Sequence, residues 1–429
     1  MSFLYSIVPT ADSANVNLKW YNILDIDKCY QTGPILVTKK KISTDHAGPK
    51  VEENDPTTLE IYSLYDIKTY QKFGLDILGN TFIVKHACEN ANLEFLNWWL
   101  ASGLKLEYNE WAIIYASSNG HENVLNWFLD SGLELKYDVQ AINAACSNGH
   151  LHILNWWLDS GLELRYDEQA IAFASEYGRE NVLNWFLGSG LELKYNCWPI
   201  NWASSNGHLH ILNWWLNSGL ELKYDCWAIK LASLNRRLHI MNWFLGSGLE
   251  LRYNEDAINT ACLRGHLDIL NWWLDSGLEL KYDSDAIVLA SKRGHLNVLN
   301  WWLDSGLVLK YDSMAIHLAS ERGHLDVLNW WLGSGLKMKY DCGAIDSAIK
   351  SRKIKTIEWW IQSGLPLKYT ECPVTWASEN GHISILKLWE EAGLPFDSSE
   401  KAIELALKND QIQVLNWWKE MGFDVSPKN

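Results

Sequence analysis

Histidine is the residue type in this sequence whose spacing comes closest to a catalytic or metal-binding pattern. Two pairs, His150-x-His152 and His208-x-His210, could each begin a metal site. In a stacked array, however, they would lie about 20 Å apart, and no H-E-x-x-H, G-x-S-x-G or glycine-rich phosphate motif occurs. Seven histidines also follow a turn in constant register, and an active-site residue would not be copied so often. We therefore expect turn residues, no catalytic residue, no metal and no cofactor; the seven are His121, His150, His208, His266, His295, His324 and His382.

Arginine provides the second suggestive pattern. Arg264, Arg293 and Arg322 recur at an interval of 29 residues, at a position where most other copies carry asparagine. In two other units Arg236-Arg237 and Arg352-Lys353 replace the Gly-His turn, so a basic ridge is predicted across repeats six to ten; its candidate partner-binding residues are Arg236, Arg264, Lys292, Arg293 and Arg322. Such a ridge could bind an acidic or phosphorylated segment of a partner, because a guanidinium pairs with a carboxylate or phosphate through two parallel hydrogen bonds. The alternative is a solvated rim that balances the glutamates of the connectors.

Overall charge and composition exclude several classes of protein. The 429 residues contain 37 Lys and Arg against 52 Asp and Glu, so the net charge of -15 argues against a nucleic-acid-binding protein. The aromatic fraction of 13% argues against a disordered acidic chain. Every apolar stretch is shorter than the roughly 20 residues of a membrane span. The eight cysteines form no C-x-x-C pair, so we expect reduced thiols in an intracellular, cytoplasmic protein.

Aromatic residues form a third group of candidates. The chain has 26 Trp against 10 Phe, and most Trp recur in one phase. Trp198, Trp202 and Trp227 fall outside that phase, and Tyr177 replaces the asparagine of a turn. Exposed Trp side chains could anchor a partner. Alternatively, they pack between neighbouring helices.

A strict repeat must position all of these residues. The glycine of a Ser-Gly-Leu motif recurs every 29 residues, and two weaker copies bring the count to twelve units. In the unit from Asp138 to Gly161, the side chain of Asp138 can cap a helix that ends near Gly149. A second helix is expected from about Leu151 to Asp159. Each unit is therefore a short helical hairpin, and the array an all-α solenoid. The repeat glycines are Gly103, Gly132, Gly161, Gly190, Gly219, Gly248, Gly277, Gly306, Gly335, Gly364, Gly393 and Gly422.

Twenty of the tryptophans belong to the repeat framework. Trp or Phe stands four residues before every repeat glycine, and a second Trp precedes it in nearly every unit. We expect this pair to fill the space between neighbouring units. An asparagine beside the pair should form a polar ladder between units or bond to the backbone. A stacking platform for single-stranded nucleic acid is the alternative, which the net charge disfavours.

The unit AIxxAS…GH…ILNWWLxSGL resembles the ankyrin repeat, whose pattern is TPLHxAA, then GH, then VVxLLLxxGA. The resemblance covers roughly residues 60 to 425, and Pro199 and Pro373 restore the family's proline. At 29 residues the unit lacks four residues of the usual connector, which implies a shortened finger with little or no strand. Short Trp-rich units of this kind are also similar to the expanded ankyrin families of giant DNA viruses, protists and fungi. The family usually binds its partners on the concave face formed by the first helices.

These inferences divide the chain into four parts and predict its role. Residues 1–58 form a non-repeat segment with a polar linker, 59–79 a degenerate half-repeat or cap, 80–398 repeats one to eleven, and 399–429 a capping repeat with a tail. The resemblance implies a monomeric, non-catalytic scaffold for protein partners, located in the host cytoplasm if the protein is viral. The alternative is a substrate adaptor that recruits a ubiquitin ligase through residues 1–58, for example by a helix pair.

Overall fold

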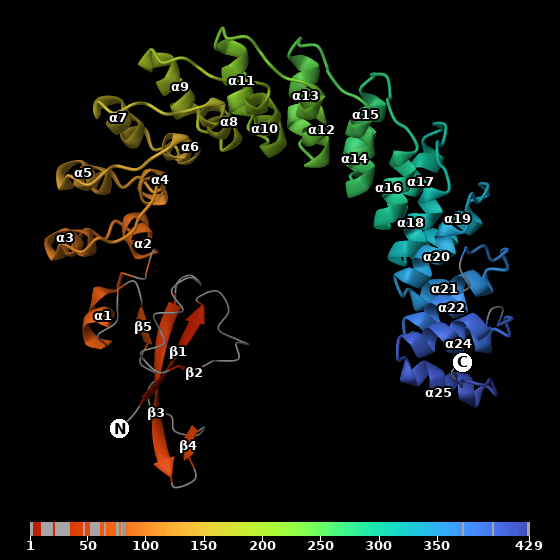
Figure 1. The fold of residues 1–429 in the computed structure, drawn as a ribbon. Helices are drawn as coiled ribbons and strands as arrows, with labels where there is room; N and C mark the ends of the chain where they lie inside the picture. Colours follow the sequence, from red (N-terminus) through yellow and green to blue (C-terminus); the bar gives the residue numbers. More distant parts are fainter. Residues whose placement is uncertain are drawn as a thin grey trace. The chain divides into compact units, whose positions relative to one another are not determined.

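The computed structural model describes residues 3–9, 20–21, 35–45, 48–51, 61–63, 66–73, 77–78, 80, 82–370, 373–396 and 399–426 (Figure 1). The chain divides into two compact units. The first comprises residues 1–203 and 210–223, and the second comprises residues 204–209 and 224–429.

A small antiparallel sheet precedes the helices in the first unit. Its strand order is β2-β1-β3-β4, and β5 pairs with β3. The expectation of a linker or loop in the polar stretch after residue 38 is wrong, because β3 continues through it and β4 lies within it. The β-branched residues Ile42 and Thr44 suit this strand, which pairs with β1, β4 and β5. The sheet also reaches beyond residue 58 through β5. The strands are β1 (Phe3–Pro9), β2 (Trp20–Tyr21), β3 (Ile35–Asp45), β4 (Gly48–Val51) and β5 (Ile61–Ser63).

Twelve helical hairpins follow a short helix, α1 (Ile67–Phe73). The predicted solenoid is confirmed for these residues. Within each unit the first helices of successive hairpins pack against one another, and so do the second helices, which gives two layers. The first-helix layer consists of α2 (Ile83–Glu89), α4 (Trp111–Ser118), α6 (Val139–Asn148), α8 (Glu168–Glu176), α10 (Trp198–Asn206), α12 (Cys226–Leu234), α14 (Asp256–Arg264), α16 (Asp285–Arg293), α18 (Met314–Arg322), α20 (Gly343–Lys350), α22 (Pro373–Glu379) and α24 (Ser399–Lys408). The second-helix layer consists of α3 (Leu93–Ser102), α5 (Glu122–Ser131), α7 (Leu151–Asp159), α9 (Glu180–Ser189), α11 (Leu209–Asn217), α13 (Leu238–Gly246), α15 (Leu267–Asp275), α17 (Leu296–Asp304), α19 (Leu325–Gly333), α21 (Ile354–Gln362), α23 (Ile383–Glu391) and α25 (Ile412–Glu420).

The predicted caps define where the first helices begin and end. The carboxylate of Asp138 accepts a hydrogen bond from the backbone N–H of Gln140 at 2.9 Å, and α6 ends where Gly149 adopts a φ of 79°. The same bond to the second following residue recurs at most of the predicted cap positions. Asn254 is an exception, because its buried Oδ1 has no hydrogen-bond partner.

The two aromatic positions of the second helices differ in burial. The ring four residues before each repeat glycine is fully buried, as predicted. The preceding tryptophan is only half-buried in most hairpins, but it also contacts the neighbouring repeat, as predicted, because its indole N–H donates to the asparagine of the preceding hairpin. Adjacent positions on a helix point about 100° apart, so only one of two neighbours can face the core fully. The fully buried rings are Trp99, Phe128, Trp157, Phe186, Trp215, Phe244, Trp273, Trp302, Trp331, Trp360, Trp389 and Trp418.

The connectors contain no strand in the described repeats, as the shortened finger predicts. Side chains join them instead. The hydroxyl of Tyr137 donates to the carbonyl oxygen of Glu163 in the next connector at 3.0 Å, and its ring packs 4.7 Å from that of Trp157. Arg165 returns a hydrogen bond to the carbonyl of Tyr137 and lies over the tyrosine ring. These contacts hold successive connectors in fixed register.

Candidate partner-binding surface

The histidines are turn residues that join neighbouring hairpins. The Nε2–H of His150 donates to the carbonyl oxygen of Ser118 at 3.0 Å, and that of His295 donates to Leu263 at 3.0 Å. Arg179 and Arg237 make the same bond through Nε where arginine replaces histidine. Burial lowers the pKa of both His150 and His295, and neighbouring cations lower it further. Within the described residues, no group of three or more His, Cys, Asp or Glu side chains could hold a metal ion.

The three arginines of the predicted ridge lie at equivalent positions, at the last turn of α14, α16 and α18. Arg264, Arg293 and Arg322 are all exposed. In several repeats that retain asparagine, that side chain bridges to the preceding hairpin; Asn235, for example, donates to the hydroxyl of Ser205 at 2.8 Å. Arginine at this position makes no such bridge in the described region, so the exchange removes an interaction from the framework.

Two members of the ridge already have acidic neighbours. Arg236 pairs with Asp268 at 2.8 Å, and Arg322 lies 3.9 Å from Glu321. Among the described residues, no carboxylate lies within 4.0 Å of Arg264 or Arg293. The unpaired guanidinium groups are thus available to an anion from outside.

Arg236 occupies a backbone position where most repeats have glycine. Its φ is 58°, in the left-handed region, whereas Gly265 and Gly294 occupy the equivalent place at 75° and 77°. A Cβ atom at Gly265 would lie 2.9 Å from the His295 ring. Opposite Arg236, His266 bonds through Nδ1 at a long 3.4 Å instead of through Nε2.

Lys292 differs from the other members of the ridge. Its side chain is half-buried, and its backbone carbonyl accepts a hydrogen bond from the Nε2–H of His324 at 3.0 Å. Lys292 and Arg293 both lie in the last turn of α16, where cations interact favourably with the helix dipole. The helix dipole alone explains a basic residue here. This explanation suits a solvated rim that balances the connector glutamates as well as it suits a ridge that binds a partner.

The aromatic candidates divide into exposed and packed side chains. Trp198 is 38% exposed and Trp227 42% exposed, so these two can contact a partner. Trp202 is half-buried and stacks on Phe173 of the preceding repeat, with ring centroids 5.8 Å apart and planes 6° apart. Its centroid also lies 5.3 Å from that of Trp198. Both alternatives for these residues therefore occur, each at a different tryptophan.

Trp227 and Tyr177 complete the predicted residues. The ammonium group of Lys230 lies 4.0 Å from the centre of the Trp227 ring and pairs with Asp256 at 2.8 Å. Tyr177 ends α8 and is half exposed. The predicted residues therefore lie on the first-helix layer, with Tyr177, Trp198 and Trp202 in the first unit and Trp227 and the basic ridge in the second.

Sequence reasoning missed a set of exposed leucines on the second-helix layer. They stand three residues before nine of the repeat glycines and are 37% to 47% exposed. Their recurrence in the NWWL motif was visible, but leucine on a helix is normally assigned to a core. The set comprises Leu100, Leu129, Leu158, Leu187, Leu216, Leu245, Leu274, Leu303 and Leu332.

Comparisons with known proteins concern the fold. No protein-family model matches the chain, and no curated protein matches it. Among the solved structures that match is the human ASB11 ankyrin repeat domain, with 16% identity and a TM-score of 0.37. The match covers 47% of this chain and 98% of that domain. In the described part of the chain, no helix is long and apolar enough to cross a membrane.

Proposed function

We propose that the chain is a non-catalytic scaffold that binds a partner protein on its first-helix layer. The basic ridge is the part of that layer with the most specific chemistry, and its ligand is an acidic or phosphorylated segment. Trp198, Trp202 and Tyr177 form a separate aromatic contact area in the first unit. The N-terminal adaptor function stays a prediction from the sequence. The described residues of that segment form strands and not the helix pair that was given as an example.

This proposal is supported most directly by the backbone strain and the lost hydrogen bonds that the arginines of the ridge cause in the repeat framework. Arg236 replaces a glycine at positive φ and displaces the hydrogen bond of His266. The other arginines replace asparagines that bridge hairpins. Local strain and lost contacts of this kind persist where another role favours them. Neutralising the connector glutamates would not require arginine at these particular positions.

The distance between the arginines of the ridge suggests how far apart the acidic residues of the ligand should be. First helices pack about 8 to 10 Å apart, and one turn of polyproline II, a common conformation of unfolded segments, takes three residues, spans about 9.3 Å and returns every third side chain to the same face. An acidic residue at every third position would therefore meet successive arginines. Binding should weaken with added salt, because the charges are exposed.

A direct test uses a labelled peptide with phosphoserine at every third position and measures fluorescence anisotropy with the full chain. Replacing Arg264, Arg293 and Arg322 by glutamate should weaken binding by about a hundredfold, since an exposed ion pair contributes up to about 1 kcal/mol and three of them together up to about 3 kcal/mol. A matched control replaces Lys281, Lys310 and Lys339 of the connectors by glutamate, which changes the net charge equally. Equal loss in both variants would reduce the ridge to a general charge effect.

A further inference from the structure

The second-helix layer carries an apolar surface that the proposed function does not use. Leu187 and Trp214 of the next hairpin line one groove, and the same leucine and tryptophan recur at equivalent positions along this layer, which we call the Leu–Trp ladder. In the first unit its members are Leu100, Leu129, Leu158 and Leu187 with Trp127, Trp156, Trp185 and Trp214. Soluble monomers rarely expose contiguous apolar areas of more than a few hundred Å², and larger areas mark interaction sites.

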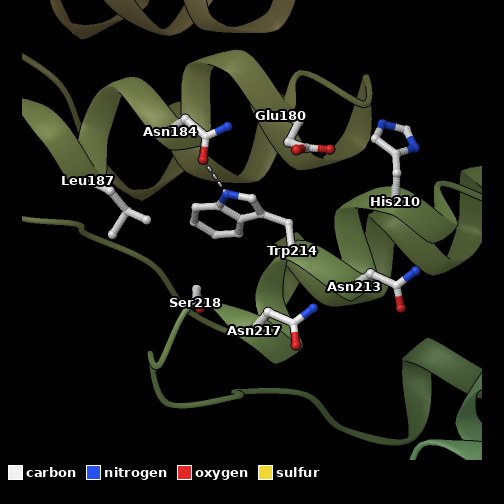
Figure 2. A pocket seen from close by; sticks show the side chains of 8 residues that line it. All are labelled: Glu180, Asn184, Leu187, His210, Asn213, Trp214, Asn217 and Ser218. Carbon is white, nitrogen blue, oxygen red and sulfur yellow. Dashed lines mark hydrogen bonds between the residues drawn. The ribbon is translucent and has the colours of Figure 1, made fainter.

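Hydrogen bonds hold the tryptophans of the ladder in place. The Nε1–H of Trp214 donates to Oδ1 of Asn184 at 2.7 Å, and Trp185 makes the same bond to Asn155 at 2.6 Å. These bonds confirm the predicted asparagine ladder between neighbouring hairpins. The amide nitrogen of Asn184 points away from the indole (Figure 2), so it can still donate to a carbonyl group from outside.

A groove shows how the ladder could accommodate a ligand. It lies between α9 and α11, has a volume of about 570 Å³, and is lined by Glu180, Asn184, Leu187, His210, Asn213, Trp214, Asn217 and Ser218. Leu187 and the Trp214 ring provide apolar surface, while the amides and the carboxylate of Glu180 surround them (Figure 2). The groove thus combines an aromatic surface, hydrogen-bond donors and one negative charge.

The charge of this layer restricts the ligand. From α3 to α19 the second helices contain no lysine or arginine, and their charged residues are all Asp or Glu. In the first unit these are Glu94, Glu122, Asp130, Asp159 and Glu180. A basic segment is therefore electrostatically complementary to the ladder, and an acidic one is not.

The period of the ladder matches one particular backbone conformation. Neighbouring helices lie about 8 to 10 Å apart, and one turn of polyproline II takes three residues and about 9.3 Å. A segment in this conformation would present the same face to each successive leucine and tryptophan. Its carbonyl groups make no internal hydrogen bonds, so the asparagine amides can donate to them. Aromatic grooves recognise proline-rich segments in the same way, with little loss of entropy.

We propose that the Leu–Trp ladder of the first unit binds a proline-rich segment in the polyproline II conformation that carries lysine or arginine among its prolines. The prolines lie against Leu187 and Trp214 and their equivalents, and a basic side chain approaches Glu180. Three hairpins would take about nine residues of ligand, which span roughly 28 Å.

The test measures anisotropy of a labelled twelve-residue peptide of repeated Pro-Pro-Arg with the full chain. A Gly-Gly-Arg peptide of equal charge controls for electrostatic attraction. The variant Leu129→Ser, Leu158→Ser, Leu187→Ser removes the apolar surface at exposed positions, and circular dichroism checks its fold. A matched control, Trp111→Ser, Val308→Ser, Met314→Ser, removes three exposed apolar side chains that lie outside the ladder.

We expect the Pro-Pro-Arg peptide to bind and the leucine variant to lose about tenfold or more in affinity, while the matched control binds normally. Should the leucine variant fold poorly, Glu180→Lys serves as a second variant and should also weaken binding. The proposal is overturned if the glycine peptide binds equally well, if both serine variants lose binding equally, or if the proline peptide does not bind. It is also overturned if the ladder instead mediates self-association or binding to neutral lipid vesicles.

Discussion

Arg236 has a backbone conformation that is unfavourable for arginine and that most repeats give to glycine. A non-glycine residue in the left-handed region costs roughly 1 to 2 kcal/mol, and the ion pair with Asp268 is exposed and offsets at most about 1 kcal/mol. We therefore expect Arg236→Gly to raise the free energy of unfolding by about 1 kcal/mol. It should also allow His266 to form the Nε2 bond made by His295 and His324.

Urea unfolding followed by circular dichroism would measure this change. The comparison with Ala91 isolates the effect of the arginine side chain. Ala91 also has a positive φ, of 51°, yet the histidine opposite it, His121, keeps its regular bond at 2.9 Å. By contrast, His382 lies opposite Arg352 at a φ of 55°, and its Nε2 has no partner. A less stable Arg236→Gly protein would show that the ion pair outweighs the backbone strain.

The buried tryptophans differ in a way that no sequence pattern reveals. Trp360 donates its indole N–H to Ser320 of the preceding first helix at 3.1 Å. The equivalent serine for Trp273 is Ser233, which donates to the carbonyl of Ala257 instead. The indole N–H of Trp273 is consequently buried without a partner. A buried donor left unpaired costs about 1 to 3 kcal/mol.

Two identical substitutions therefore should have different costs. Trp273→Phe and Trp360→Phe remove the same volume from equivalent sites, and each ring packs 4.9 Å from a tyrosine. Only Trp360→Phe breaks a hydrogen bond and leaves a serine unpaired. We expect it to destabilise the chain by about 1 to 3 kcal/mol more than Trp273→Phe. Equal unfolding midpoints for the two variants would contradict this account.

The sequence was sufficient to predict those features whose surroundings are the same in nearly every repeat. The caps, the turn glycines, the asparagine ladder and the buried ring recur in nearly every unit, so their type and spacing were sufficient to predict them. The exceptions at Asn254 and Trp273 were not predictable, because the same residue types make different bonds there. The exposure of Leu187 and its equivalents was missed for a related reason. Recurrence shows that a position is structural, but not which side of the helix faces solvent.

At the scale of the elements, partly buried histidines join each hairpin to its neighbour and make the array sensitive to pH. Burial lowers the pKa of His150 and His295 in the folded state and outweighs the bond from Nε2 to a backbone carbonyl, which favours the protonated ring. The unfolded chain therefore binds protons more readily than the folded chain below pH 7. Stability from these groups is fully present above the unfolded pKa of about 6.5 and is lost as the pH falls below it.

We accordingly expect the urea midpoint to fall between pH 7 and pH 5. His295→Gln keeps a side-chain N–H donor but removes the titrating ring, so its midpoint should depend less on pH over this range. Asp285 acts in the opposite direction at lower pH, because burial and nearby aspartates raise its pKa. It is present in both proteins and cancels in the comparison. Identical slopes for the two proteins would exclude a contribution from His295.

At the scale of the whole molecule, the repeats change character towards the C-terminus. The leucine of the ladder is replaced by Ile361, then by Glu390 and Lys419 in the last two hairpins. Both charged side chains are exposed. Repeat proteins need polar terminal units because the stacking surface would otherwise attract another chain. These residues interrupt the apolar surface in the last two hairpins, and Lys419 lies in the predicted capping repeat.

This arrangement predicts the effect of continuing the ladder. The double variant Glu390→Leu, Lys419→Leu leaves the net charge unchanged and extends the exposed apolar surface to the last hairpin. We expect it to associate with itself as its concentration rises, because large exposed apolar areas promote association. Sedimentation velocity should show a monomeric natural chain and larger species for the variant. As a control, Lys401→Leu, Glu404→Leu places two leucines at exposed sites of the first helix α24, and it should stay monomeric. Association of the control alone, or of both proteins equally, would indicate that added hydrophobicity acts without regard to the ladder.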